Sequence, residues 1–311
     1  MGRGWIPAAG LAAVLALAAC DPVTSPVPGA RPPAPAPQAP ATQSAQSKAL
    51  ESYFARVQQS LVTQGLLRTD GGGPDVPFNA RMLTANFEQI ALFEEYTIIG
   101  GRLVAQPTPS RLHRWKGPVR FELEFGATVA QAKQRADRAE VARFAQRLAK
   151  ATRHPVTTVP DNGNFHVFIV NEDERRALGP RLRQLLPGIG PAALDSALNM
   201  GRATYCAVFA VDPRDDGNYT RAVAIIRAEH PDLLRKSCIH EELAQGLGLA
   251  NDSPAARPSI FNDDEEFALL TYHDELLLRI LYDSRLRAGM TASEARPIVR
   301  TIAEELLGAD S

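Results

Sequence analysis

The chain has 311 residues, and its 34 lysines and arginines nearly balance its 35 aspartates and glutamates, which gives a formal net charge of −1. This length suits one large domain or two ordinary ones, and the hydrophobic share of 45% is typical of a globular protein. The balanced charge argues against nucleic acid as a partner, because that partner requires a strongly basic surface.

Residues 1–19 have the character of an export signal. Arg3 supplies a short positive start, and residues 6–19 form an apolar run that is too short for a comfortable membrane span. The run ends in Leu17-Ala18-Ala19-Cys20, which resembles the lipobox of bacterial lipoproteins. This resemblance implies that Cys20 is lipidated and becomes the first mature residue. An ordinary secretory signal that happens to contain a cysteine is the alternative.

Residues 20–47 are rich in proline, alanine, glutamine and serine, with few bulky apolar side chains. Such a segment cannot bury enough surface to offset the entropy lost on ordering, so we expect a tether between a lipid bilayer and a folded body. The expected location is the cell envelope, on the periplasmic side, with the anchor in the inner or the outer membrane.

Two cysteines remain for the folded part, Cys206 and Cys238. In an oxidising compartment an isolated pair usually forms a disulfide, and closing a loop of about 30 residues would stabilise the fold by roughly 3–4 kcal/mol on the chain-entropy model. Two buried free thiols are the alternative.

Residues 48–110 predict a helical region. Apolar residues at helical spacing predict an amphipathic helix over Lys48–Gln64, and a weaker pattern predicts a second helix over Pro77–Ile90. A strand is expected from Glu94 to Ile99, where Gly100 and Gly101 end it.

Residues 111–311 predict a single α+β domain with a mixed β-sheet. Strict alternation predicts a strand over Val119–Phe125, and Thr128 is expected to cap a helix that runs to about Thr152. Strands at 155–159 and 164–170 are expected to form a hairpin through Asp161-Asn162-Gly163. The later elements are expected to be short helices at 172–186 and 191–200, strands at 204–211 and 221–228, and helices at 231–247, around 276–281 and at 291–307.

The helix expected over Pro231–Leu247 carries the most informative polar residues. At about 100° per residue, Glu241 and Gln245 share one face, one turn apart, and Glu242 lies at its edge. His240 falls far from Glu241, on the side that would pack inward.

Residues 241–252 resemble the zinc-peptidase pattern H-E-x-x-H-x-x-G-x-x-H-D of the zincins and metzincins. Glu242, Gly248 and Asp252 keep the glutamate, the glycine and the final aspartate of that pattern. All three histidine positions are changed, to Glu241, Gln245 and Asn251. The resemblance implies a degenerate zincin-like helix-turn with Glu242 in the place of the general base.

The altered positions are poor zinc ligands. Glu241 can bind zinc, but the neutral amides of Gln245 and Asn251 bind it weakly and suit a harder cation or a polar cluster without metal. Whether zinc or another divalent cation binds here therefore stays open. We favour a polar cluster without metal, formed by Glu241, Gln245, Asn251 and Asp252. His273 is a candidate ligand from outside the motif, against the alternative of a capping or core histidine.

The run from Cys238 to Asp252, followed by Pro258-Ser-Ile-Phe-Asn-Asp263, also resembles a bacterial envelope family named domain of unknown function 2927, over about Arg111–Gly289. The resemblance implies an exported protein without an established activity. We therefore expect a membrane-anchored lipoprotein with a degenerate, non-catalytic metallopeptidase-like domain. The alternatives are an active metal-dependent hydrolase with atypical ligands, and a module that binds an envelope protein or a cell-wall partner. Whether the chain is an enzyme stays open.

Overall fold

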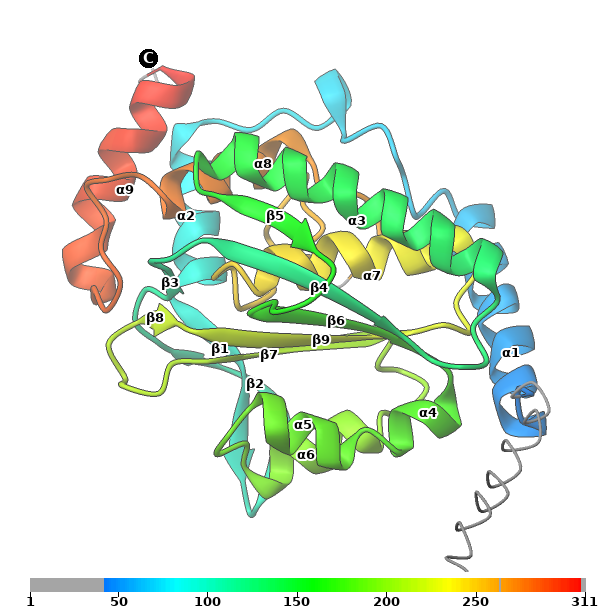
Figure 1. The fold of residues 1–311 in the computed structure, drawn as a ribbon. Helices are drawn as coiled ribbons and strands as arrows, with labels where there is room; N and C mark the ends of the chain where they lie inside the picture. The colour runs from blue at the N-terminus through cyan, green and yellow to red at the C-terminus, as the bar shows by residue number, and fades with distance from the viewer. Residues whose placement is uncertain (1–41, 263, 309–311) are drawn as a thin grey trace, which may run out of the picture. The chain divides into compact units, whose positions relative to one another are not determined.

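The computed structural model describes residues 42–262 and 264–308 (Figure 1). The predicted signal peptide, Cys20 and most of the predicted tether lie outside these residues. Helix α1, Ala45–Thr63, starts inside the segment expected to be tether, because the Ser44 side chain accepts a hydrogen bond from the Ser47 amide and caps the first turn. In the described part of the chain, no helix is long and apolar enough to cross a membrane.

A five-stranded mixed sheet forms the centre of the domain, in the order β5-β4-β6-β9-β7. Strand β4 pairs in parallel with β5 and β6, and β6 pairs in parallel with β9, whereas the edge strand β7 is antiparallel to β9. The strands span Val119–Phe125 (β4), Val156–Val159 (β5), Phe165–Val170 (β6), Cys206–Val211 (β7) and Arg221–Arg227 (β9). The prediction of an α+β domain with a mixed sheet is confirmed.

The expected hairpin between β5 and β6 is wrong, because β4 lies between these two strands and pairs with both in parallel. The connecting segment passes close to β4 instead of turning back on itself. A Cβ added at Gly163 would lie 2.5 Å from the Cβ of Glu122, so only glycine allows this approach. Asn162 does adopt the positive φ typical of a turn. The prediction of a turn here is therefore correct, whereas the predicted pairing of the two strands is wrong.

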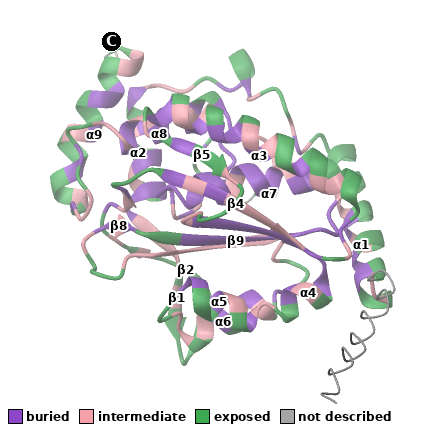
Figure 2. Cartoon of the chain, in the orientation of Figure 1, coloured by how far each residue is buried: buried purple, intermediate pink, exposed green. Residues whose placement is uncertain are grey.

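Helices cover both faces of the sheet (Figure 1). On one face, α3, α7 and α8 enclose a core that includes Phe121, Val167 and Leu243. On the other face, α5 and α6 pack over Phe168, Val223 and Ile225, and α4 contacts α6. The helices span Gln131–Thr152 (α3), Glu172–Arg176 (α4), Gly179–Leu185 (α5), Pro191–Leu198 (α6), Asp232–Gln245 (α7) and Tyr272–Leu281 (α8). Figure 2 shows the central strands buried between these two layers.

Thr128 does not cap α3, contrary to expectation, and Ala130 occupies that position. The amide and the hydroxyl of Thr128 both donate to Oε1 of Glu174, at 2.7 and 2.8 Å. A charged acceptor makes a stronger hydrogen bond than a neutral one, which explains why this contact prevails.

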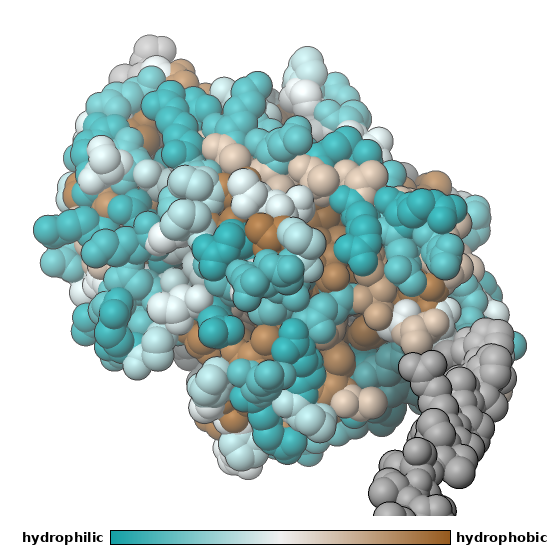
Figure 3. Space-filling model, in the orientation of Figure 1, coloured by the Kyte–Doolittle hydropathy of each residue, from teal (hydrophilic) through white to brown (hydrophobic). Residues whose placement is uncertain are grey.

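The remaining elements surround this body. Helix α2, Ala80–Ala91, packs against α8 and against the closing helix α9, Ala292–Leu307. The predicted strand β1, Phe93–Ile99, forms an antiparallel hairpin with β2, Arg102–Pro109, which the sequence did not predict. The short elements are η1 (Gly73–Asp75), β3 (Arg114–Trp115) and β8 (Asn218–Tyr219). Hydrophilic side chains cover most of the face seen in Figure 3, and apolar side chains show between them.

Candidate functional site

Helix α7 is held at both ends by specific contacts. At its start, Nε of Arg235 donates to both carboxylate oxygens of Asp137 on α3, each at 2.9 Å. At its end, Gly248 has φ +124°, and an added Cβ would lie 2.1 Å from the carbonyl oxygen of His113. Glycine is therefore required at this position of the motif, and the turn it permits leads the chain on to Asn251 and Asp252.

A disulfide joins Cys206 on β7 to Cys238 on α7, with their Cα atoms 5.9 Å apart, and the predicted pairing is confirmed. The bond ties the edge strand to the helix one turn before Glu241. Sγ of Cys206 lies 3.9 Å from Oε2 of Glu241. Because this sulfur is oxidised, it offers no thiolate to a metal.

Two adjacent carboxylates, Glu241 and Glu242, come together beside the disulfide, with an oxygen of each and Sγ of Cys206 all within 4.8 Å of one another. Glu242 is only 4% exposed, and its Oε2 has no hydrogen-bond partner among the described residues. Burial and the negative charges of Glu95 and Asp252 raise the pKa of Glu242 well above its ordinary value. Burial and the charges of Asp252 and Glu242 do the same to the pKa of Glu241.

The other two changed positions of the motif have different surroundings. Nε2 of Gln245 donates to Oδ1 of Asp252 at 3.2 Å, so these two side chains belong to one cluster. Nδ2 of Asn251 instead donates to the carbonyl oxygen of Gln89 at 2.8 Å, and its backbone amide donates to Ile90. Asn251 therefore ties the turn to the end of α2. Its Oδ1 is buried and accepts no hydrogen bond from the described residues.

His240 lies on the far side of α7, as the helical geometry predicts. Its ring stacks on Phe144 with centroids 4.0 Å apart. The Leu270 amide donates to Nδ1 at 3.1 Å, so the ring proton is on Nε2, which lies 3.2 Å from Oε1 of Glu140. His240 thus fastens α7 to α3.

His273 is placed by the structure in the packing of α2 against α8. Its side chain is fully buried, Nε2 lies 3.0 Å from Nδ2 of Asn86, and the ring meets Phe78 edge-on. Since the Asn86 amide donates, Nε2 accepts and Nδ1 carries the proton. These contacts fit the core histidine that the sequence left as the alternative.

Sequence reasoning missed Glu95 on β1 and Glu265 in the loop before α8, whose charges contribute to the raised pKa of Glu241. They reach the site through tertiary packing, as shown by the Glu95 amide, which donates to the Ala250 carbonyl at 3.3 Å. No local sequence pattern around Glu95 or Glu265 predicts that they lie near Glu241.

The residues present do not fit a catalytic zinc. Catalytic zinc sites include histidine or cysteine among their three protein ligands, and here the cysteine sulfur is oxidised and His240 faces away. The oxygen donors of Glu241 and Glu242 fit a hard cation such as Ca²⁺, which takes carboxylate and amide oxygens. Such a cation would stabilise the site most by binding to the Glu242 oxygen that has no hydrogen-bond partner among the described residues.

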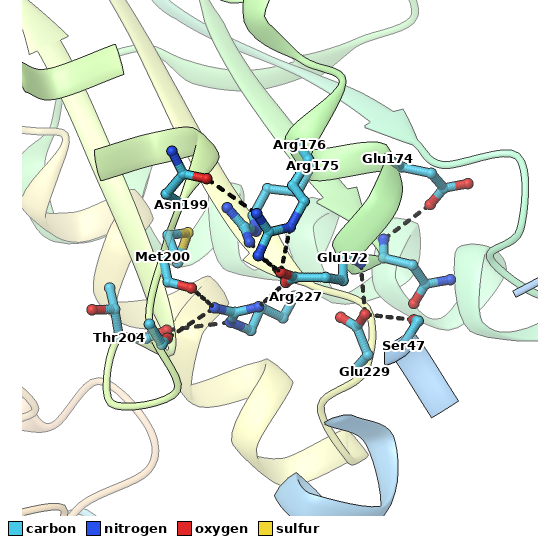
Figure 4. A network of polar contacts seen from close by, with 12 residues as sticks. Ser47, Glu172, Glu174, Arg175, Arg176, Asn199, Met200, Thr204, Arg227 and Glu229 are labelled. Carbon is cyan, nitrogen blue, oxygen red and sulfur yellow. Dashed lines mark hydrogen bonds and ion pairs between the residues drawn. The ribbon is translucent and has the colours of Figure 1, made fainter. Parts of the chain in front are cut away.

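A contrasting buried carboxylate lies at the carboxyl end of β6 and β9 (Figure 4). Oε2 of Glu172 accepts hydrogen bonds from Arg175 and Arg227, each at 2.7 Å, and Oε1 accepts one from Arg176 at 2.8 Å. Burial alone would raise the pKa of Glu172, but these hydrogen bonds outweigh it and lower the pKa to about 2. The same network reaches α1, where Oγ of Ser47 donates to Glu229.

Comparison with known proteins identifies a family. The sequence model of a family described as "Protein of unknown function (DUF2927)" matches residues 80–301. No curated protein and no solved structure matches the chain. The match covers the sheet, α7 with its turn, and the disulfide, and the chain therefore belongs to the DUF2927 family, whose function is unknown.

Proposed function

We propose that this protein is a lipid-anchored envelope protein whose α7 turn binds a hard divalent cation and does not hydrolyse peptides. The degenerate metallopeptidase-like motif then serves as a scaffold for the cation. The observation that carries the proposal is Glu242, which is 4% exposed and lies beside a second carboxylate, and whose Oε2 finds no hydrogen-bond partner among residues 42–262 and 264–308.

The electrostatics of the cluster support a cation. A buried carboxylate is costly unless it is paired, and here the charges that raise the pKa values of Glu241 and Glu242 are those of other carboxylates. A divalent cation would offset this repulsion. Since the cysteine sulfur is oxidised, the donors that the described residues of this cluster leave to a cation are oxygens, which favours Ca²⁺, Mg²⁺ or Mn²⁺ over zinc.

The location is supported by two features. The Leu17-to-Cys20 segment resembles a lipobox, and the disulfide suits an oxidising compartment. Cys20→Ala should therefore move the protein from the membrane fraction to the soluble fraction. Retention of this variant in the membrane fraction would contradict the anchor.

A second candidate is a binding module for an envelope protein or a cell-wall partner. It is favoured by the β1–β2 hairpin, which exposes large apolar side chains, with Ile98 60% and Ile99 51% exposed. Exposed apolar patches of this kind often mark interaction surfaces. This role is compatible with a cation site, since Glu95 lies on the same hairpin.

Metal analysis of the full-length protein, purified in detergent without chelators and dialysed against Ca²⁺, tests the proposal. We expect one bound equivalent that is lost in Glu242→Gln and retained in the control Glu304→Gln, which changes an exposed residue of α9. Absence of bound cation, or equal binding by both variants, would contradict the proposal. Peptide hydrolysis that depends on added zinc and on Glu242 would instead favour the hydrolase.

A further inference from the structure

The face of the sheet covered by α4–α6 carries a second group of metal-ligand side chains, unrelated to α7. Glu122 and Glu124 extend from β4, and His166 extends from the neighbouring parallel strand β6, where it pairs in register with Glu122. Nδ1 of His166 lies 3.2 Å from Oε1 of Glu124 and 3.9 Å from Oε2 of Glu122. One nitrogen and two carboxylate oxygens thus meet within 4.8 Å of one another.

This group borders a pocket of about 730 Å³. Arg181 and Gln184 of α5 form one wall, and the 162–164 segment forms another. Glu122 and His166 line the pocket, which therefore gives solutes access to them, and Glu122 and Glu124 are both half-buried. A bound ion could therefore enter here and keep exchangeable ligands.

The surroundings of the His166 imidazole allow a cation to bind at Nδ1. It is 3% exposed, and its Nε2 is buried without a hydrogen-bond partner among the described residues. In the absence of an ion, Nδ1–H faces the carboxylates as a donor. Moving the proton from Nδ1 to Nε2 breaks the hydrogen bond from Nδ1 to Oε1 of Glu124, and Nδ1 then offers its lone pair toward both carboxylates.

We propose that His166, Glu122 and Glu124 form a site for a divalent transition metal of the Zn²⁺ type. An imidazole with two carboxylates is a ligand set that such ions accept, in contrast to the cluster at α7, which offers no imidazole among the described residues. The Gly163 amide donates to Oε2 of Glu122 at 2.7 Å and orients that carboxylate, as outer-shell partners of metal ligands do.

Arg181 competes with the metal. Its Nη2 and Nε donate to Oε1 and Oε2 of Glu124, at 2.8 and 3.2 Å, and hold a positive charge where the ion would bind. Removing this guanidinium should therefore tighten metal binding, whereas an ordinary structural ion pair would lose stability and gain no metal affinity.

The test is Zn²⁺ titration of the full-length protein in the Glu242→Gln background, which removes the cluster at α7, after chelator treatment and dialysis. We expect one site, weakened at least about 10- to 100-fold by His166→Gln or Glu122→Gln, and unchanged by His154→Gln, whose ring contacts the Gly117 carbonyl instead. We expect Arg181→Gln to tighten the site.

Two outcomes would overturn the proposal. One is no Zn²⁺ binding by the parent protein, and the other is binding that His166→Gln and Glu122→Gln leave unchanged. If circular dichroism shows that His166→Gln does not fold, the Zn²⁺ affinities of Glu122→Gln and Arg181→Gln test the proposal instead. Neither result depends on the Ca²⁺ binding tested at Glu242.

Discussion

Glu172 and Glu242 are both removed from water, at 3% and 4% exposure, but their surroundings are opposite. Arginines donate to both oxygens of Glu172 and lower its pKa to about 2. Glu242 has a carboxylate as its neighbour and one oxygen without a hydrogen-bond partner in the described part of the chain, and its pKa is raised. The first arrangement is complete within the protein, whereas no basic side chain among the described residues pairs with Glu242.

The difference separates two roles for buried charge. Glu172 holds α4 to β9 through Arg227, whose guanidinium also donates to the carbonyls of Met200 and Gly201. The hydrogen bonds of Glu172 therefore stabilise the fold. The carboxylates of α7 cost stability unless a cation binds, and a cost of this kind is typical of functional sites.

Removing the charge of Glu172 should have the largest effect. Glu172→Gln leaves Arg175 and Arg227 buried without their carboxylate, and we expect a loss of about 3–5 kcal/mol in the free energy of unfolding. Denaturant unfolding of this variant beside Glu304→Gln measures it. A loss below about 1 kcal/mol would mean that the arginines find other partners, and the contrast with Glu242 would fail.

The stabilisation by Glu172 should also depend on pH, and the change in unfolding free energy with pH should be smaller than the full loss in Glu172→Gln. The pKa of Glu172 is lowered from 4.5 to about 2, so its stabilising contribution is full above about pH 4.5 and disappears as the pH falls toward 2. The difference in unfolding free energy between the wild type and Glu172→Gln should therefore shrink across this range. A constant difference would show that Glu172 does not act through its charge.

Particular elements show what the sequence could predict. Helical periodicity placed Glu241 and Gln245 on one face of α7 and His240 on another, and the structure agrees because a helix is determined by local geometry. The compartment argument paired Cys206 with Cys238.

The failures concern contacts between distant segments. The turn at Asp161–Gly163 could not reveal that β4 would lie between β5 and β6. The residues that complete the sites, Glu95 near α7 and Glu122 opposite His166, are far from their partners in sequence, and only strand pairing and loop packing bring them together.

The most direct test of the central claim is the thermal stability of Glu242→Gln and the wild type, each with chelator and with Ca²⁺. With chelator, the variant should be the more stable protein, because it lacks the repulsion of Glu242 by Glu95 and Asp252. At about 100 times its dissociation constant, Ca²⁺ should stabilise the wild type by about 2.7 kcal/mol and leave the variant unchanged. A wild type that is more stable than the variant with chelator, and that Ca²⁺ does not stabilise, would contradict a cation site at α7.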